Sequence, residues 1–154
     1  MIKKWNEIEK IYAAIIQALV AYNQNINVYA YNEMGNKCVL TKIYHHKKIY
    51  SILPVGNTPS WEACIEVYKL MDRRGRNIIL NLSDGLCNVG IGYNYAMRYC
   101  DQRKIDLVTL GSGLNIKRLS KKYERNRVIY FEDIEELPDV IQNIFRAKLL
   151  HRVA

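Results

Sequence analysis

The sequence predicts an α/β protein built on a doubly wound, mostly parallel sheet with one antiparallel edge strand. Apolar runs rich in Val, Ile and Leu alternate with segments whose apolar residues recur every three or four positions. Strands that alternate with amphipathic helices are typical of a parallel sheet covered on both faces. Of the 154 residues, 49% are apolar and 25% are charged, a balance that favours one globular domain over a disordered chain.

The first part of the chain is predicted to form a helix and a hairpin. From Trp5 to Tyr22 the apolar residues stand at helical spacing, which indicates an amphipathic helix packed against a flat surface. The segments "INVYAYN" and "CVLTKIY" are rich in β-branched and aromatic residues, and the short connection "EMGNK" joins them. We therefore expect two antiparallel neighbouring strands.

The rest of the chain is predicted to alternate between helices and strands. A helix is expected to begin at Thr58-Pro59-Ser60, because Thr is a favoured N-cap and Pro fits the first helical position. After it come the strand "NIILNLS", a helix over 93–102, the strand "IDLVTLGSG", a basic helix over 116–123, the strand "RVIYFED" and a helix over 134–150. Functional residues of such sheets gather where parallel strands end, and Asp84 stands at one of these ends.

Several classes of protein are disfavoured by composition. No apolar run approaches the roughly 20 residues that span a bilayer, and the first residues lack the apolar core of a signal peptide. We therefore expect a cytoplasmic protein that has no membrane partner. The four cysteines stand far apart with no CxxC pair, so neither a zinc site nor a disulfide framework is indicated.

Basic residues outnumber acidic ones and give a formal net charge of +8. One cluster lies along the predicted basic helix and consists of Lys117, Arg118, Lys121, Lys122 and Arg125. Such a patch attracts nucleic acid or an acidic protein face. A solvated basic surface that binds nothing is the more common case.

The order of several motifs resembles the von Willebrand factor type A domain, above all the branch of cobaltochelatase T-subunits and nitric-oxide-reductase activation proteins. These motifs are "GNTPS" before a helix, "NIILNLSDG", "IDLVTLGSG" and "FEDIEELPDVIQNIF". The resemblance implies the strand order 3-2-1-4-5-6 and a metal-ion-dependent adhesion site, which usually holds magnesium. It matches Thr58 to the threonine ligand of the second loop and Asp84 to the aspartate ligand of the third.

The chain departs from this family at the first motif of the metal site. No Asp-x-Ser-x-Ser occurs in the sequence, and Met1 stands where the family has just completed that motif. Residues 1–154 are therefore interpreted as a single, N-terminally incomplete domain of this type, which lacks the central first strand. Two protein oxygens are a poor site for Mg²⁺, which demands octahedral coordination, so we expect magnesium only if the missing ligands are supplied from elsewhere.

The missing strand also bears on the partners expected for the chain. Without it the edges of "INVYAYN" and "NIILNLS" are unpaired, and such edges readily pair with another chain. The chain that pairs with these edges is expected to be either a separate N-terminal fragment or a second copy of this chain, which would form a homo-oligomer. Otherwise the sheet closes up and the domain is a metal-free relic.

The resemblance implies a non-enzymatic protein–protein interaction module. In this branch such domains work with ring-shaped AAA+ ATPases in chelatase-like or remodelling complexes, and the metal grips an acidic residue of the partner. Asn57, Gly85 and Asn88 are the residues expected to touch that partner. The alternative is a basic domain that binds nucleic acid or an acidic protein and has a degenerate metal site.

Thr58 and Asp84 each have a simpler interpretation that requires no metal. Thr58 fits an N-cap. The pair Asp84-Gly85 fits a turn, because Asp accepts local backbone hydrogen bonds and Gly permits positive φ. Their joint occurrence, in the family order and on loops predicted to lie where the strand order reverses, favours an origin in a metal site.

Overall fold

The computed structural model describes residues 2–21, 25–52, 56–72, 74–75, 77–83 and 90–150. The chain forms two compact units, residues 1–27 with 131–154, and residues 28–130. The first unit contains α1 (Ile2–Val20), the short 3-10 helix η1 (Ile134–Glu136) and α5 (Leu137–Leu150). The helices α1 and α5 pack against each other, and the predicted helices at both ends of the chain are confirmed. The interpretation of residues 1–154 as one incomplete domain stays a prediction.

The second unit begins with two hairpins. The strands β1 (Tyr29–Met34) and β2 (Lys37–Lys42) pair antiparallel, as the sequence predicts. The strands β3 (Tyr44–His45) and β4 (Lys48–Ile49) form a smaller hairpin that the sequence did not predict. Its turn residues His46 and Lys47 both have positive φ, a conformation that is usually signalled by Gly or Asn.

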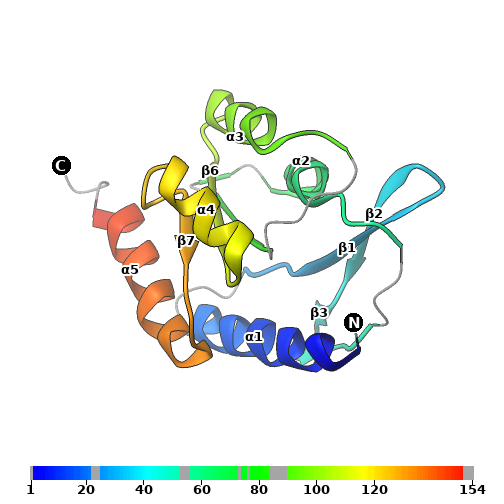
Figure 1. Ribbon diagram of the computed structural model, residues 1–154, viewed down its shortest axis with the longest axis horizontal. Helices are drawn as coiled ribbons and strands as arrows, with labels where there is room; N and C mark the ends of the chain where they lie inside the picture. The colour runs from blue at the N-terminus through cyan, green and yellow to red at the C-terminus, as the bar shows by residue number, and fades with distance from the viewer. Residues whose placement is uncertain are drawn as a thin grey trace. The chain divides into compact units, whose positions relative to one another are not determined.

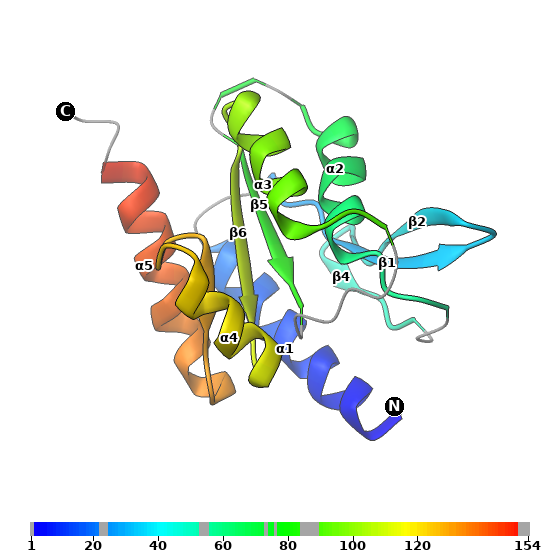
Figure 2. The same cartoon turned by 45° about the horizontal axis from the view of Figure 1, so that its top comes forward.

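A three-stranded parallel sheet follows, with the order β5-β6-β7 (Figures 1 and 2). Its strands are β5 (Ile78–Leu82), β6 (Asp106–Gly111) and β7 (Val128–Tyr130). The helices α2 (Ser60–Leu70), α3 (Tyr93–Gln102) and α4 (Leu114–Lys122) alternate with them. The predicted α/β class with parallel strands is therefore confirmed.

The β1–β2 hairpin does not join the parallel sheet. Among the described residues, β1 pairs with β2 and β5 pairs with β6, and no ladder connects β1 to β5. The helix α2 packs against β1, β2 and β5, so one helix covers strands of both sheets. The antiparallel strands thus form a sheet of their own instead of the predicted edge of the parallel sheet.

The start of α2 differs from the prediction by one residue. The helix begins at Ser60, and Pro59 is its N-cap, with φ −89° and ψ 59° and no side-chain capping bond. The Pro59 carbonyl accepts the first intrahelical hydrogen bond, from Ala63 N–H at 3.0 Å. Thr58 therefore precedes the N-cap, and its interpretation as the capping residue is wrong.

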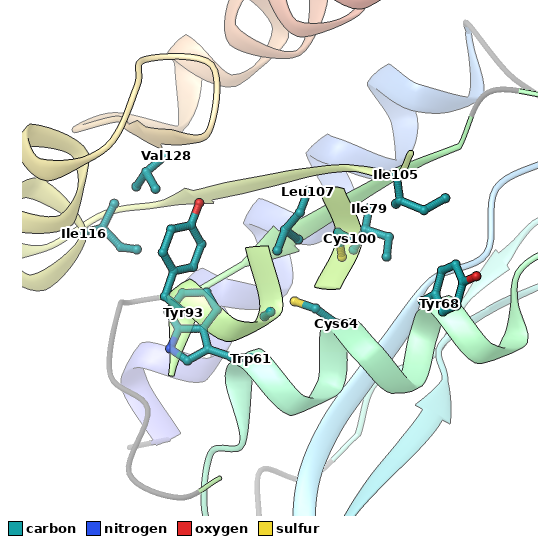
Figure 3. Packing of buried hydrophobic residues seen from close by; sticks show 11 residues of the cluster. Trp61, Cys64, Tyr68, Ile79, Tyr93, Cys100, Ile105, Leu107, Ile116 and Val128 are labelled. Carbon is teal, nitrogen blue, oxygen red and sulfur yellow. The ribbon is translucent and has the colours of Figure 1, made fainter. Parts of the chain in front are cut away.

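The core of the second unit lies between the parallel sheet and its helices. Figure 3 shows Trp61, Cys64 and Tyr68 of α2 and Cys100 of α3 around the sheet residues Ile79 and Leu107. Ile116 of α4 and Val128 of β7 extend this cluster. No helix in the described part of the chain combines the length and apolar character needed to cross a membrane.

Gly111 ends β6 at a point where the backbones of β5 and β6 approach closely. A Cβ added there would overlap the backbone carbonyl oxygen of Ser83 and would lie 2.8 Å from Cγ1 of Ile116. The neighbouring ladder is intact, because Ser83 N–H donates to the Leu110 carbonyl at 3.0 Å. A side chain at position 111 would therefore force β5, β6 and α4 apart.

The substitution Gly111→Ala is expected to lower the free energy of unfolding by about 2 kcal/mol, because the overlap is with backbone, which cannot turn aside. The matched control is Gly92→Ala at the N-cap of α3, where an added Cβ meets nothing within 4 Å and the expected loss is below about 1 kcal/mol. Urea denaturation measures both variants. Equal losses would contradict the assigned close approach.

Candidate functional site

The carboxyl edge of the parallel sheet gathers the first turns of two helices. The helix α2 ends shortly before β5 begins and packs on it, so the first turn of α2 lies near the end of β5. The same reasoning places the first turn of α3 near the end of β6. The rings of Trp61 and Tyr93, which belong to these two first turns, meet edge to face with centroids 4.8 Å apart. Loops at such an edge are where open α/β sheets bind their ligands.

The described residues on either side of segment 84–89 lie at this edge of the sheet. Ser83 is the last described residue after β5 and is hydrogen-bonded to β6. The chain is next described at Gly90, where an added Cβ would lie 2.8 Å from Oε2 of Glu62 in the first turn of α2. The two ends of the predicted Asp84 loop therefore lie at the same edge as Thr58, which stands two residues before α2.

The predicted site residues are only partly within the described structure. Thr58 is half-buried and Asn57 is exposed. The Asn57 side chain donates a hydrogen bond of 2.6 Å from Nδ2 to Oε2 of Glu33 on β1. Asp84, Gly85 and Asn88 lie outside the described residues. Among the residues that are described, no group of three or more His, Cys, Asp and Glu side chains could hold a metal.

A row of polar groups near this edge is buried without hydrogen-bond partners among the described residues. Asn81 of β5 and Thr109 of β6 are register neighbours, so their side chains share one face of the sheet. Among the described residues, Nδ2 of Asn81 and Oγ1 of Thr109 have no hydrogen-bond partner. The buried hydroxyl of Tyr93 likewise has no hydrogen-bond partner among them. Figure 3 shows that hydroxyl pointing away from Trp61 toward Ile116 and Val128.

These polar residues were not predicted as site residues, because they stand inside apolar runs. The runs "NIILNLS" and "IDLVTLGSG" indicate buried strands, and Asn81 and Thr109 lie within them. The available signal was Asn81 itself, because Asn is uncommon in strand interiors. A buried polar atom without a partner is costly, so this row marks a position where packing alone does not explain the residue type.

Burial controls the titration of two groups in the same core. It raises the pKa of the Tyr93 hydroxyl well above its ordinary value, while the positive charge of Arg127 opposes the rise. It also raises the pKa of the Cys100 thiol to about 11. Both groups are therefore neutral at physiological pH, and Cys100 is a weak nucleophile because the thiolate is the reactive form.

The predicted basic patch forms one exposed stripe on α4 and the turn after it, the α4 stripe. Its five members, which are all exposed, are Lys117, Arg118, Lys121, Lys122 and Arg125. Ile116 is buried on the opposite side of the helix. Among the described residues, no acidic side chain forms an ion pair with Arg118, Lys121 or Lys122. The charge of these three side chains is thus not neutralised within the described part of the chain.

Comparison with known proteins supports the fold alone. No protein-family model matches the sequence, and no curated protein matches it. Among solved structures, the chain is similar to proximal thread matrix protein 1 from the mussel byssus, with a TM-score of 0.67 and 13% sequence identity. The match covers 90% of this chain and 42% of that protein, so the chain spans less than half the length of its structural relative.

The substitution Thr109→Val is expected to raise the free energy of unfolding by about 1 kcal/mol, because it replaces an unpartnered buried hydroxyl with a methyl group of the same shape. Thr109→Ser is the matched control, since it keeps the hydroxyl, removes the methyl and should lower stability by about 1 kcal/mol. Urea denaturation of both variants provides the measurement. A loss of stability in Thr109→Val would mean that the hydroxyl has a partner, such as a buried water.

Proposed function

We propose that this chain is a non-enzymatic protein–protein interaction module of von Willebrand factor type A. It acts through the carboxyl edge of the parallel sheet. The observation that carries the proposal is the convergence at that edge of the segment before α2, which holds Thr58, and the two ends of the loop that holds Asp84. These are the segments that the family resemblance assigns to the metal site.

The strand topology of the second unit supports the proposal. The family order 3-2-1-4-5-6 contains an antiparallel pair and a parallel group of three strands on either side of one central strand. The hairpin β1–β2 and the sheet β5-β6-β7 have the corresponding directions and chain order. The similarity to the thread matrix protein also supports the fold. It gives no information about the partners of this chain.

The proposed contact is a metal bridge between two proteins. Thr58 and Asp84 supply a hydroxyl and a carboxylate oxygen, which suit a hard divalent cation such as Mg²⁺. The remaining ligands come from an Asp-x-Ser-x-Ser segment outside residues 1–154, and an acidic residue of the partner closes the site. By analogy with the resembling branch, the partner is a ring-shaped AAA+ ATPase, an inference from family likeness rather than from the site.

The metal bridge can be tested with a synthetic peptide that carries an apolar strand followed by Asp-x-Ser-x-Ser. With this peptide present, the chain is expected to bind Mg²⁺ in calorimetry. The substitutions Asp84→Ala and Thr58→Val should each weaken the Mg²⁺ affinity at least about tenfold. Loss of a residue that only hydrogen-bonds to a metal ligand already weakens metal affinity by about that factor, and loss of the ligand itself should weaken it at least as much. Addition of EDTA should abolish Mg²⁺ binding by the chain.

The control for this experiment is Asp139→Ala, which removes an exposed carboxylate of α5 in the other unit and should leave Mg²⁺ binding unchanged. Unfolding curves of all the variants separate loss of binding from loss of fold. Unaltered Mg²⁺ affinity in Asp84→Ala would contradict the metal bridge.

A second candidate function is binding of an anionic partner, a nucleic acid or an acidic protein face, by the α4 stripe. The specific observation in its favour is that four cations project from a helix of nine residues. The pairs 117/121 and 118/122 are each one turn apart, so they lie along the same side of the helix. Such a stripe concentrates positive potential on one surface.

The double substitution of Lys121 and Lys122 by Gln is expected to weaken binding of a single-stranded oligonucleotide. It should also reduce the slope of log affinity against log salt by roughly 0.7 for each phosphate that the two side chains neutralise, the value for single strands. The matched control replaces Lys42 and Lys48 of the hairpins, which are equally exposed. Fluorescence anisotropy at several salt concentrations measures both variants. Equal reductions in the two variants would show that net charge, and not the α4 stripe, governs binding.

A further inference from the structure

The outer edge of β5 carries backbone groups that have no partner among the described residues. Asp106 N–H donates to the Asn77 carbonyl at 3.4 Å, and Ser83 N–H donates to Leu110 at 3.0 Å. Successive residues of a strand direct their N–H and C=O groups to opposite sides. The odd-numbered residues from 77 to 83 therefore face β6, and Ile78, Leu80 and Leu82 direct their backbone groups away from it.

Strand pairing within the described part of the chain leaves that outer edge open. The parallel sheet ends at β5 on this side, because its order is β5-β6-β7. The backbone groups of Ile78, Leu80 and Leu82 form no hydrogen bond with the described residues. Three donors and three acceptors are thus arranged at the spacing that an extended chain requires.

The β5 edge also lacks the features that protect natural sheet edges from pairing. Exposed edges are usually guarded by Lys, Pro, a bulge or an inward-pointing charge. The strand Ile-Ile-Leu-Asn-Leu has no charged residue, no Pro and no Gly, and its ladder to β6 runs without interruption over five residue pairs. The side chains of Ile78, Leu80 and Leu82 are half-buried, so the edge is apolar and regular.

The outer edge of β1, on the other side of the same helix, is bridged to residue 57. In β1 the N–H of Glu33 points away from β2, because it donates to the Asn57 carbonyl at 3.1 Å. Asn57 belongs to the segment that leads into α2, so the outer edge of β1 faces the side where α2 lies. The Tyr31 hydroxyl donates to Oγ of Ser60 at 3.2 Å and fixes β1 to the start of that helix. Thus α2 contacts strands on both sides of an interruption in strand pairing.

From these features we propose that β5 accepts a strand from a second polypeptide by edge addition. The ligand is an extended segment rich in Val, Ile and Thr with few charges, because a strand beside β5 lies within an α/β sheet, where strands are nearly continuously apolar. Main-chain hydrogen bonds to Ile78, Leu80 and Leu82 provide the affinity. This interaction needs no metal, so it is independent of Thr58 and Asp84.

Amide hydrogen exchange tests the proposal on the intact chain. The probe is a peptide of roughly eight residues, the length of one strand, that contains Val, Ile and Thr, has Lys at its ends and lacks Asp-x-Ser-x-Ser. In the free chain the amides of Ile78, Leu80 and Leu82 should exchange rapidly, and those of Ile79 and Asn81, which pair with β6, should be protected. Saturating peptide should slow hydrogen exchange at the three outer amides at least about tenfold. The same slowing is expected when EDTA is present and in the Asp84→Ala variant.

Two variants provide a structural control for the exchange experiment. Leu80→Pro removes an outward N–H and leaves every hydrogen bond to β6 in place, which sheet edges tolerate, so it should abolish peptide binding. Leu80→Ala keeps that N–H and should retain most of the binding. A second peptide with Pro at alternate positions cannot form the ladder and should not bind.

Three results would overturn the proposal. Protection of Ile78, Leu80 and Leu82 in the free monomer would show that the chain itself covers this edge. Concentration-dependent protection with a dimer in sedimentation would assign the edge to a second copy of the chain. Unchanged exchange at saturating peptide would exclude strand addition. Because the assay contains no metal, none of these results depends on whether the metal bridge of the proposed function exists.

Discussion

The parallel pairing of β5 with β6 is the interaction on which the second unit depends. Parallel neighbours need a crossover connection, and α3 provides it while packing back on the sheet beside α2. This pairing directs Ile79 and Leu107 into the core cluster and brings the ends of both strands to one edge. The close approach of Gly111 to Ser83 sets the distance between the strands there. The position of the candidate site at the carboxyl edge follows from that arrangement.

The same pairing explains why the core is not fully apolar. Asn81 and Thr109 occupy adjacent register positions and are both buried, where apolar side chains would pack without leaving polar atoms unpartnered. Proteins violate the rules of core packing mainly at functional or strained sites. The row lies two residues before Ser83 and Gly111 at the carboxyl edge, which is where the proposed partner contact is made. The polar row thus supports that edge as the functional one, on grounds other than family resemblance.

The three proposed interactions use different surfaces and different physical forces. The metal bridge relies on oxygen ligands at the carboxyl edge, strand addition on main-chain hydrogen bonds along the side of β5, and anion binding on the charge of α4. Strand addition is the most direct consequence of the topology, because an unguarded edge favours pairing. It also links the two proposals about the sheet, since a polypeptide that adds a strand beside β5 could bring further metal ligands to the edge where that strand ends.

The sequence by itself determined the local elements of this protein and their order. Helix 93–102, the β1–β2 hairpin and the strands of the parallel sheet were all predicted, because hydrophobic period and turn residues act over a few neighbouring positions. It also predicted that Asp84 stands at a strand end, and the family resemblance matched Thr58 to a second loop of the same site. Only the tertiary structure decided that β1 does not pair with β5, that Pro59 and not Thr58 caps α2, and that Asn81 and Thr109 are neighbours. These features depend on contacts between residues far apart in the chain, whose geometry local patterns do not specify.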